Sequence, residues 1–303
     1  MTLQQLRQVL TIAESNSMNE AAKKLFVSQP NLSATVREVE EELGITVFMR
    51  NNRGITVTAE GEEFLGYAKQ VVEQYHLLEN RYLNVESKKK FSVSMQHYSF
   101  AVKAFVQLAK EVGMDEYEFA VHETKTKEVI DNVKNLKSEI GVLYLSDFNE
   151  KVLRKLFKEC DIEFKELFTC NTYVYLWKKH PLAGKKVITL DDLQEYPCLT
   201  FEQGVNNSFY YAEEMMSTYE YKRVIKADDR ATMLNLMVGL NGFTLCSGII
   251  SEDLNGDDYA AIPLKESEKM HIGYIKHKGT KLSKLGEIYI CLLYTSDAAD
   301  DKA

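Results

Sequence analysis

Apolar positions in the first 45 residues recur three or four residues apart, which is the spacing of amphipathic helices. In the first helix they are Leu3, Leu6, Val9, Leu10 and Ala13. Ser17 and Glu20 form a capping-box pair, so a short second helix is expected to start there. Ser28 can cap a third helix that tolerates Pro30 in its first turn, and Gly44 suits a left-handed C-cap. The pattern predicts three successive helices.

Two short strand-like runs, 46–50 and 55–58, follow the third helix and flank the sequence Asn51-Asn52-Arg53-Gly54. This polar, basic tip predicts a β-hairpin. Three helices followed by a hairpin form a winged helix-turn-helix, which we assign to residues 1–58. The third helix has one apolar stripe and a polar opposite side, and side chains on such a free side can reach base edges in a DNA groove.

A single long helix is predicted from Ala59 to about Asn84, roughly 39 Å long at ~1.5 Å per residue. Its apolar seam steps by four and three residues through Phe64, Ala68, Val71, Tyr75, Leu78 and Tyr82. We expect this seam to pair with a second copy of the chain, as in a coiled coil. The alternative is that the seam packs against the same chain. With the polar residues that follow, residues 59–90 form a linker and dimerisation segment.

Strand-like and helical runs alternate after residue 90. Such alternation predicts largely parallel sheets with helices on both faces. Roughly 200 residues are more than one small sheet needs, so we expect two α/β lobes with a cleft between them. Folds of this class bind small ligands at the carboxyl ends of their strands, and the cleft is therefore the expected ligand site.

The net charge is distributed unevenly along the chain. The 303 residues hold 37 Lys and Arg against 45 Asp and Glu, a net charge of -8 that argues against a broadly basic coat protein or a polybasic membrane binder. Residues 1–90 carry 11 basic and 12 acidic groups, so most of the acidity lies in residues 91–303. Four acids, Glu38, Glu40, Glu41 and Glu42, lie at the far end of the third helix. Because each subunit can neutralise few phosphates, we expect DNA affinity to come from multivalency.

Several classes of protein are argued against by simple absences in the sequence. There is no apolar stretch of about 18 residues to span a membrane, and the first residues lack the pattern of a signal peptide. The five cysteines are odd in number, widely spaced and without a C-x-x-C pair, which disfavours structural zinc and a disulfide framework. We expect a cytoplasmic protein with no membrane partner.

Residues 17–33, SMNEAAKKLFVSQPNLS, resemble the DNA-binding helix pair of LysR-type transcriptional regulators. Residues 43–50 and 58–61 are similar to the family's wing and to the start of its linker helix. His180-Pro181-Leu182-Ala183 and Gly239-Leu240-Asn241-Gly242 resemble recurring stretches of its effector-binding domain. The resemblance covers about residues 1–293.

This resemblance implies a bacterial regulator that binds double-stranded promoter DNA, contacts RNA polymerase and responds to a small-molecule effector. Its linker helices would pair antiparallel into a homodimer, and dimers into a homotetramer. The implied fold is a winged helix-turn-helix, a linker helix and a two-lobed α/β domain at 91–293 like that of periplasmic binding proteins. One lobe would comprise about 91–162 and 266–293, and the other about 163–265.

The residues that we expect to contact DNA are Ser28, Gln29, Pro30, Asn31, Ser33, Arg37, Arg50 and Arg53. Gln29 and Asn31 can each pair with adenine through two hydrogen bonds, whereas Ser28 suits capping or phosphate contact. Arg53, at the hairpin tip, is the better candidate for a minor groove. The alternative is a three-helix bundle whose polar side is only solvated.

The residues that we expect to bind the effector are His97, Tyr98, Ser99, Thr124, Thr126, Thr200 and Phe201. Ser99 and its neighbouring backbone amides follow a strand and start a helix, which makes a ready anion site. The resemblance implies that Ser99, Thr124 and Thr126 hold a ligand through their hydroxyls. We expect a small carboxylate or another anion, while Tyr98 and Phe201 would also suit a ring. Ordinary helix capping is the alternative for these hydroxyls.

No H-E-x-x-H, G-x-S-x-G, Walker or G-x-G-x-x-G motif occurs, and the six histidines show no metal spacing. We expect no catalytic residue, no metal and no cofactor. The alternatives are a solute-binding protein or an α/β enzyme, against which the winged helix argues. Residues 294–303 are polar and acidic, and we expect a disordered or non-native tail there.

Overall fold

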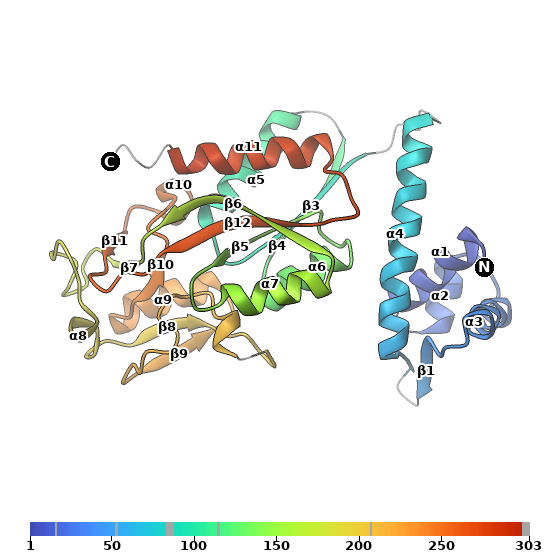
Figure 1. The fold of residues 1–303 in the computed structure, drawn as a ribbon, viewed down its shortest axis with the longest axis horizontal. Helices are drawn as coiled ribbons and strands as arrows, with labels where there is room; N and C mark the ends of the chain where they lie inside the picture. The colour runs from blue at the N-terminus through green and yellow to red at the C-terminus, as the bar shows by residue number, and fades with distance from the viewer. Residues whose placement is uncertain (16, 52–53, 83–87, 114–115, 207, 299–303) are drawn as a thin grey trace. The chain divides into compact units, whose positions relative to one another are not determined.

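The computed structural model describes residues 1–15, 17–51, 54–82, 88–113, 116–206 and 208–298. The chain divides into two compact units, Met1–Ser87 and Lys88–Ala303, whose elements are labelled in Figure 1. Among the described residues, no helix combines the length and the apolar character that a membrane crossing requires.

Three helices and a hairpin open the N-terminal unit. They are α1 (Leu3–Ala13), α2 (Met18–Lys24), α3 (Gln29–Leu43), β1 (Phe48–Asn51) and β2 (Gly54–Val57). The caps act as predicted: the Ser17 and Ser28 hydroxyls accept hydrogen bonds from the backbone amides of Glu20 and Asn31, and Gly44 adopts φ 70°. The helices bury one core, which includes Val9, Ile12, Met18, Ala21, Leu32, Val36 and Val39. Since β1 and β2 pair antiparallel, the predicted winged helix-turn-helix is confirmed.

The long helix α4 (Ala59–Tyr82) divides its apolar residues between two faces. Ala68 is buried with Leu6 of α1, and Phe64 packs against the same cluster. For Ala68 the expected pairing with a second copy is therefore wrong, and the alternative of packing within the chain holds, whereas Phe64 is only partly covered. The physical reason is that a straight helix drifts by about 20° per heptad relative to a strict seam, so one stripe faces different neighbours along its length.

The remaining seam residues of α4 lie elsewhere on the helix. Val71, Tyr75 and Leu78 are exposed within the chain, as is Tyr67. The side chain of Tyr82 lies outside the described residues, as does the predicted helix end at Asn84. The face that the chain leaves uncovered is thus shifted toward the second half of α4.

The first lobe of the C-terminal unit is a five-stranded sheet between two layers of helices (Figure 1). Its strands are β3 (Lys89–Met95), β4 (Tyr117–Glu123), β5 (Ile140–Leu145), β6 (Ile162–Cys170) and β12 (Met270–His277), in the order β4-β3-β5-β12-β6. The helices are α5 (Ser99–Val112), α6 (Thr126–Lys134), α7 (Glu150–Glu159) and α11 (Lys284–Ala298). α5 and α11 share one core with the sheet, while α6 and α7 share another.

The second lobe is built from shorter elements. They are β7 (Tyr173–Trp177), α8 (Leu190–Leu193), β8 (Cys198–Phe201), a 3-10 turn (Phe209–Tyr211), β9 (Val224–Ala227), α9 (Arg230–Leu240), β10 (Thr244–Cys246), α10 (Glu252–Asn255) and β11 (Tyr259–Pro263). β7 pairs antiparallel with β10 and β11, and β8 pairs parallel with β9. The expectation of largely parallel sheets therefore holds for β3, β4 and β5 but not for most of this lobe.

Two predicted boundaries are wrong. The family resemblance implies that residues 163–170 belong to the second lobe, yet β6 pairs antiparallel with β12 along its whole length and so belongs to the first sheet. The sequence pattern places residues 294–298 in a tail, yet α11 continues to Ala298, because no Gly or Pro follows Gly286 to stop it. The Tyr294 hydroxyl donates to the Glu166 carbonyl at 3.3 Å, which ties this last turn to β6. Residues 299–303 lie outside the described part.

Candidate functional site

The N-terminal half of α3 presents its polar residues on the side opposite its buried stripe. Asn31 and Arg37 are exposed, and Pro30 is exposed at the start of the helix. Gln29 donates through Nε2 to the Ser33 hydroxyl at 2.9 Å, so these two predicted residues are held together along the helix. This side of α3 can reach base edges or phosphates without disturbing the core.

The predicted wing residues are only partly described. Arg50 pairs with Ile55 in the β1–β2 ladder through its backbone, but its side chain lies outside the described residues. Arg53 also lies outside them.

Phe26 in the turn before α3 was missed by the sequence reasoning. Its side chain is 96% exposed and its φ is 55°, a left-handed conformation that is a real outlier for a bulky residue. Together with Asn19, Lys23 and Gln29 it borders a hollow at the surface. Such strain in an exposed aromatic residue is a reason to look for function. The sequence could have indicated it, because Phe26 is an aromatic residue in a predicted turn and does not fit the spacing of the buried residues.

Three of the four acids at the far end of α3 have partners within the N-terminal unit. Glu40 accepts backbone hydrogen bonds from Val47 and Phe48 at 2.7 and 3.0 Å. Glu42 pairs with the N-terminal ammonium group at 2.6 Å, and Glu38 accepts from the Gln5 side chain at 3.0 Å. Glu40 thereby holds the start of the hairpin against α3.

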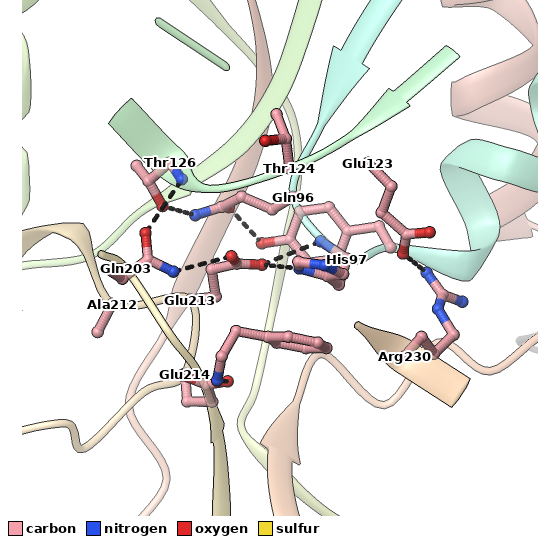
Figure 2. A network of polar contacts seen from close by, with 12 residues as sticks. Gln96, His97, Glu123, Thr124, Thr126, Gln203, Ala212, Glu213, Glu214 and Arg230 are labelled. Carbon is pink, nitrogen blue, oxygen red and sulfur yellow. Dashed lines mark hydrogen bonds and ion pairs between the residues drawn. The ribbon is translucent and has the colours of Figure 1, made fainter. Parts of the chain in front are cut away.

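In the C-terminal unit, the carboxyl ends of β3 and β5 meet a segment of the second lobe (Figure 2). Glu213 accepts through Oε2 from the backbone N–H of His97 at 3.0 Å, and His97 Nδ1 lies 2.7 Å from the same oxygen. The Gln203 amide donates to Glu213 Oε1 at 2.9 Å. The His97 ring also stacks on Phe201 with centroids 3.6 Å apart. One buried carboxylate is thus held by groups from both lobes.

A second set of hydrogen bonds joins the lobes beside Glu213 (Figure 2). The Thr126 backbone N–H donates to Gln203 Oε1 at 3.2 Å, and its hydroxyl donates to the Tyr211 carbonyl at 2.7 Å. Gln96 donates to the Thr126 hydroxyl at 2.6 Å. The Tyr144 hydroxyl donates to the Ala212 carbonyl at 3.0 Å. Thr126 and Tyr144 of the first lobe therefore both donate to the second lobe.

The cleft encloses a pocket next to the stacked His97 and Phe201 rings. Both lobes contribute to its wall, which includes Tyr98, Ser99, Tyr175, Glu214, Arg230, Met233, Met237, Thr244, Cys246 and Ser247. Its volume is about 90 Å³, whereas typical small-molecule sites have ~300–1,000 Å³. In this conformation the pocket therefore accepts only a small molecule.

The polar groups of this wall are unequally satisfied. The Thr244 hydroxyl has no hydrogen-bond partner among the described residues, although Thr244 is only 6% exposed. Glu214 accepts from the Phe201 backbone N–H at 2.8 Å. Burial, and secondarily the negative charge of Glu213, raises the pKa of Glu214 to about 8. Arg230 forms an ion pair with Glu123 across the lobes.

The structure brings together some of the predicted effector residues and separates others. His97, Tyr98, Ser99 and Phe201 line the pocket. Thr124 instead donates to the Glu128 side chain on its own lobe; the N-cap of α6 is Lys125, so this bond is not the helix cap of the alternative. The Thr126 hydroxyl donates to the Tyr211 carbonyl of the other lobe, and Thr200 lies opposite Lys226 in the parallel pair of β8 and β9.

The sequence did not indicate five further residues of this cleft, which are Gln203, Glu213, Glu214, Arg230 and Thr244. An acidic pair within the aromatic and apolar run 209–216 was the one signal available for Glu213 and Glu214. Among the described residues, no group of three or more His, Cys, Asp or Glu could hold a metal ion.

Two family models match the sequence. Residues 3–62 match the model described as bacterial regulatory helix-turn-helix protein, lysR family, and residues 114–288 match the LysR substrate binding domain. The chain is 25% identical over 299 residues to the HTH-type transcriptional regulator CysL of Bacillus subtilis, covering 95% of each chain.

Solved structures with the same fold span nearly the whole chain. A full-length OxyR variant from Pseudomonas aeruginosa has a TM-score of 0.67 at 19% identity, covering 97% of this chain and 98% of that one. CbnR, a LysR family transcriptional regulator, has a TM-score of 0.58 at 17% identity, covering 98% and 99%. At these low sequence identities, the structural similarity is evidence for the fold alone.

Proposed function

The chain belongs to the LysR family of bacterial transcriptional regulators, and from this premise we propose which of its surfaces read DNA and which bind the effector. Proteins of this family join a DNA-binding helix-turn-helix to a domain that binds a small-molecule effector. The assignment rests mainly on the exposed polar side of α3. This helix begins at its N-cap Ser28, and its opposite side packs into the apolar core.

We assign the base-reading role to Gln29 and Asn31, phosphate contacts to Ser28 and Arg37, and close approach to the backbone to Pro30 and Ser33. Arg50 and Arg53 would serve the wing. A gel shift on a fragment of the gene's own promoter, at stated salt, tests this. Asn31→Ala should cost ~1–3 kcal/mol and relax specificity at one base position, whereas Arg37→Ala should weaken binding uniformly and reduce the salt slope by about 1.

A matched control is available on the same helix. Glu41 is exposed at the far end of α3, so Glu41→Gln should lose no operator affinity. Equal losses from Asn31→Ala and Glu41→Gln would contradict the assignment, because the effect would then not depend on the reading end. If the wild-type chain retains no promoter fragment specifically at any salt, the proposed function itself fails.

Phe26 extends the proposed DNA surface. Its exposed ring lies just before the recognition helix and beside Lys23, where an apolar side chain can contact a sugar or a thymine methyl group. Phe26→Asn relieves the left-handed strain, since Asn tolerates this conformation. We expect unchanged or slightly higher stability together with weaker operator binding. Unchanged binding would remove Phe26 from the DNA surface.

We place the effector site in the cleft of the C-terminal unit, at the pocket lined by His97, Ser99, Phe201 and Thr244. Its small volume favours a small molecule, and we retain a carboxylate or another anion as its class. A thermal-shift screen of metabolites against the full chain identifies the ligand, and Thr244→Val should weaken the response to it. A ligand that stabilises Thr244→Val equally well would bind elsewhere.

Assembly and partners complete the proposal. The exposed residues Tyr67, Val71, Tyr75 and Leu78 of α4 would pair with a second copy, giving a dimer and by further pairing a tetramer. The regulator would act in the bacterial cytoplasm on double-stranded promoter DNA and contact RNA polymerase. We assign it no catalytic role, metal or cofactor.

A further inference from the structure

The carboxylate of Glu213 is held as a bound anion would be. It comes from the second lobe, and it accepts hydrogen bonds from the His97 backbone N–H at 3.0 Å and from the Gln203 amide at 2.9 Å. His97 Nδ1 lies 2.7 Å from the same oxygen and donates to it when it carries the proton. The His97 and Glu213 side chains are only 6% and 4% exposed. Hydrogen bonds to an ionised carboxylate are about twice as strong as neutral ones.

The position of this carboxylate is where an α/β lobe accepts anions. His97 follows β3 and precedes α5, so its N–H lies between the carboxyl end of a parallel strand and the start of a 14-residue helix. Helix starts favour a negative charge, and the carboxyl ends of strands are where α/β folds bind ligands. The place at which a free anion was expected is therefore filled, in this conformation, by a side chain of the same protein.

The same pocket also has a buried hydroxyl without a partner among the described residues. It belongs to Thr244, a residue that lines the pocket and is more than nine-tenths buried. An unmatched buried hydroxyl costs free energy unless a ligand or water satisfies it. Met233 and Met237 add apolar surface to the wall of the pocket, and the Tyr175 hydroxyl is also without a partner in the described part of the chain. The pocket thus has an anion position and room for the body of a small molecule.

We propose that Glu213 is an intramolecular ligand, and that an effector carboxylate binds by replacing it at His97 while the body of the effector lies against Thr244. This inference rests on the proposed function, because it takes the cleft to be the effector site. The exchange has a regulatory consequence. Glu213 ties the second lobe to His97, so its replacement frees the segment 201–216 from that contact.

Chemical rescue tests the exchange without knowledge of the natural effector. In Glu213→Ala the His97 and Gln203 donors lose their acceptor, and the removed carboxylate leaves a space of similar shape to acetate. The probe is sodium acetate, added to the full chain without DNA and at ionic strength held constant with sodium chloride. We expect a lower melting temperature for Glu213→Ala, which saturating acetate raises by about 2–4 °C. The wild type should shift much less, because its own carboxylate competes.

Two controls make the rescue specific. Acetamide has the shape of acetate without the charge and should not rescue Glu213→Ala. Glu266 also accepts a backbone N–H at a helix start, that of Leu190 at 3.1 Å, but it is exposed and outside the pocket. Glu266→Ala should therefore show no selective response to acetate.

Equal shifts by acetate and acetamide, or equal responses of Glu213→Ala and the wild type, would overturn the proposal. If Glu213→Ala does not fold, Glu213→Gln replaces it. The new side chain in Glu213→Gln has one oxygen. If that oxygen accepts from the His97 N–H, the NH2 group of the new side chain faces the NH2 group of Gln203, and two donors meet. Acetate should therefore again stabilise the variant more than acetamide does. Operator binding with failed rescue would defeat only this inference, whereas rescue in a chain that binds no promoter would defeat only the proposed function.

Discussion

Pairing of the exposed face of α4 can be tested by replacing Val71 and Leu78 with Asp. Both side chains are exposed in the single chain, 51% and 56% respectively, so the fold of the subunit does not depend on them. The contacts that hold α4 to α1 are made instead by Ala68 and Val72 with Leu6. The double substitution should therefore leave the melting temperature of the subunit nearly unchanged while removing the proposed interface.

The expected loss follows from the area that pairing would cover. Complete burial of a Val or Leu side chain contributes ~1.5–3 kcal/mol, and about half of each is still exposed, so pairing gains roughly 1 kcal/mol per side chain. Two residues in each of two chains give ~4 kcal/mol, and unpaired buried carboxylates would add to the loss. At ~1.4 kcal/mol per tenfold change, the dimer should dissociate at least about a thousandfold more readily.

Sedimentation velocity measures the assembly, and a gel shift on a fragment with both half-sites measures operator binding. Monomers lose the advantage of linked binding, which commonly amounts to a factor of ~10²–10⁴. Glu73→Lys changes the charge at an exposed position on another side of the same helix and should preserve both properties. A demonstrated monomer that binds the operator as tightly as the wild type would refute the reasoning.

Three further predictions concern stability and reactivity. Ser28→Ala should lower the free energy of unfolding by about 0.5–1 kcal/mol in urea titrations, since the cap bond to the Asn31 N–H is long at 3.4 Å; no change would mean that the cap contributes nothing. The pKa of Glu214 is raised to about 8, so the folded chain keeps a proton that the unfolded chain releases near pH 4.5. Stability should therefore be greatest below pH 4.5 with respect to this group and fall by ~3–5 kcal/mol as pH rises to about 8, and Glu214→Gln should flatten that fall. Burial raises the pKa of Cys246 to about 12 and also raises that of Cys198, whereas Cys291 is exposed. An aromatic disulfide reagent at pH 8 should thus modify Cys291 long before Cys198 or Cys246, and Cys291→Ser should remove the fast phase.

The features that the sequence predicted are those set by neighbouring residues. Ser17, Ser28 and Gly44 mark helix ends through contacts within four residues, and the structure confirms all three. His97 and Ser99 could be placed in the cleft because they follow a strand and start a helix, which is also a local arrangement.

The features that it did not predict depend on distant partners. β6 belongs to the first sheet because it pairs with β12, about a hundred residues later. Glu213 reaches His97 across 116 residues, and only the closing of the two lobes brings them together. Nothing in the sequence around Glu213 specifies that contact, since an acidic pair next to aromatic residues would be equally compatible with an exposed turn.

The acids of α3 acquire a different meaning once their partners are known. Counted by charge alone, they only weaken attraction to phosphate. Glu40, however, holds the backbone of Val47 and Phe48, and so fixes the wing relative to the recognition helix. Under the proposed function both elements contact the same stretch of DNA. The Glu40 carboxylate would then help to hold them in position, although its negative charge weakens the attraction to phosphate. Under the proposed function, a DNA-binding unit that is nearly neutral would bind DNA weakly alone, and its affinity would then come from copies paired through α4.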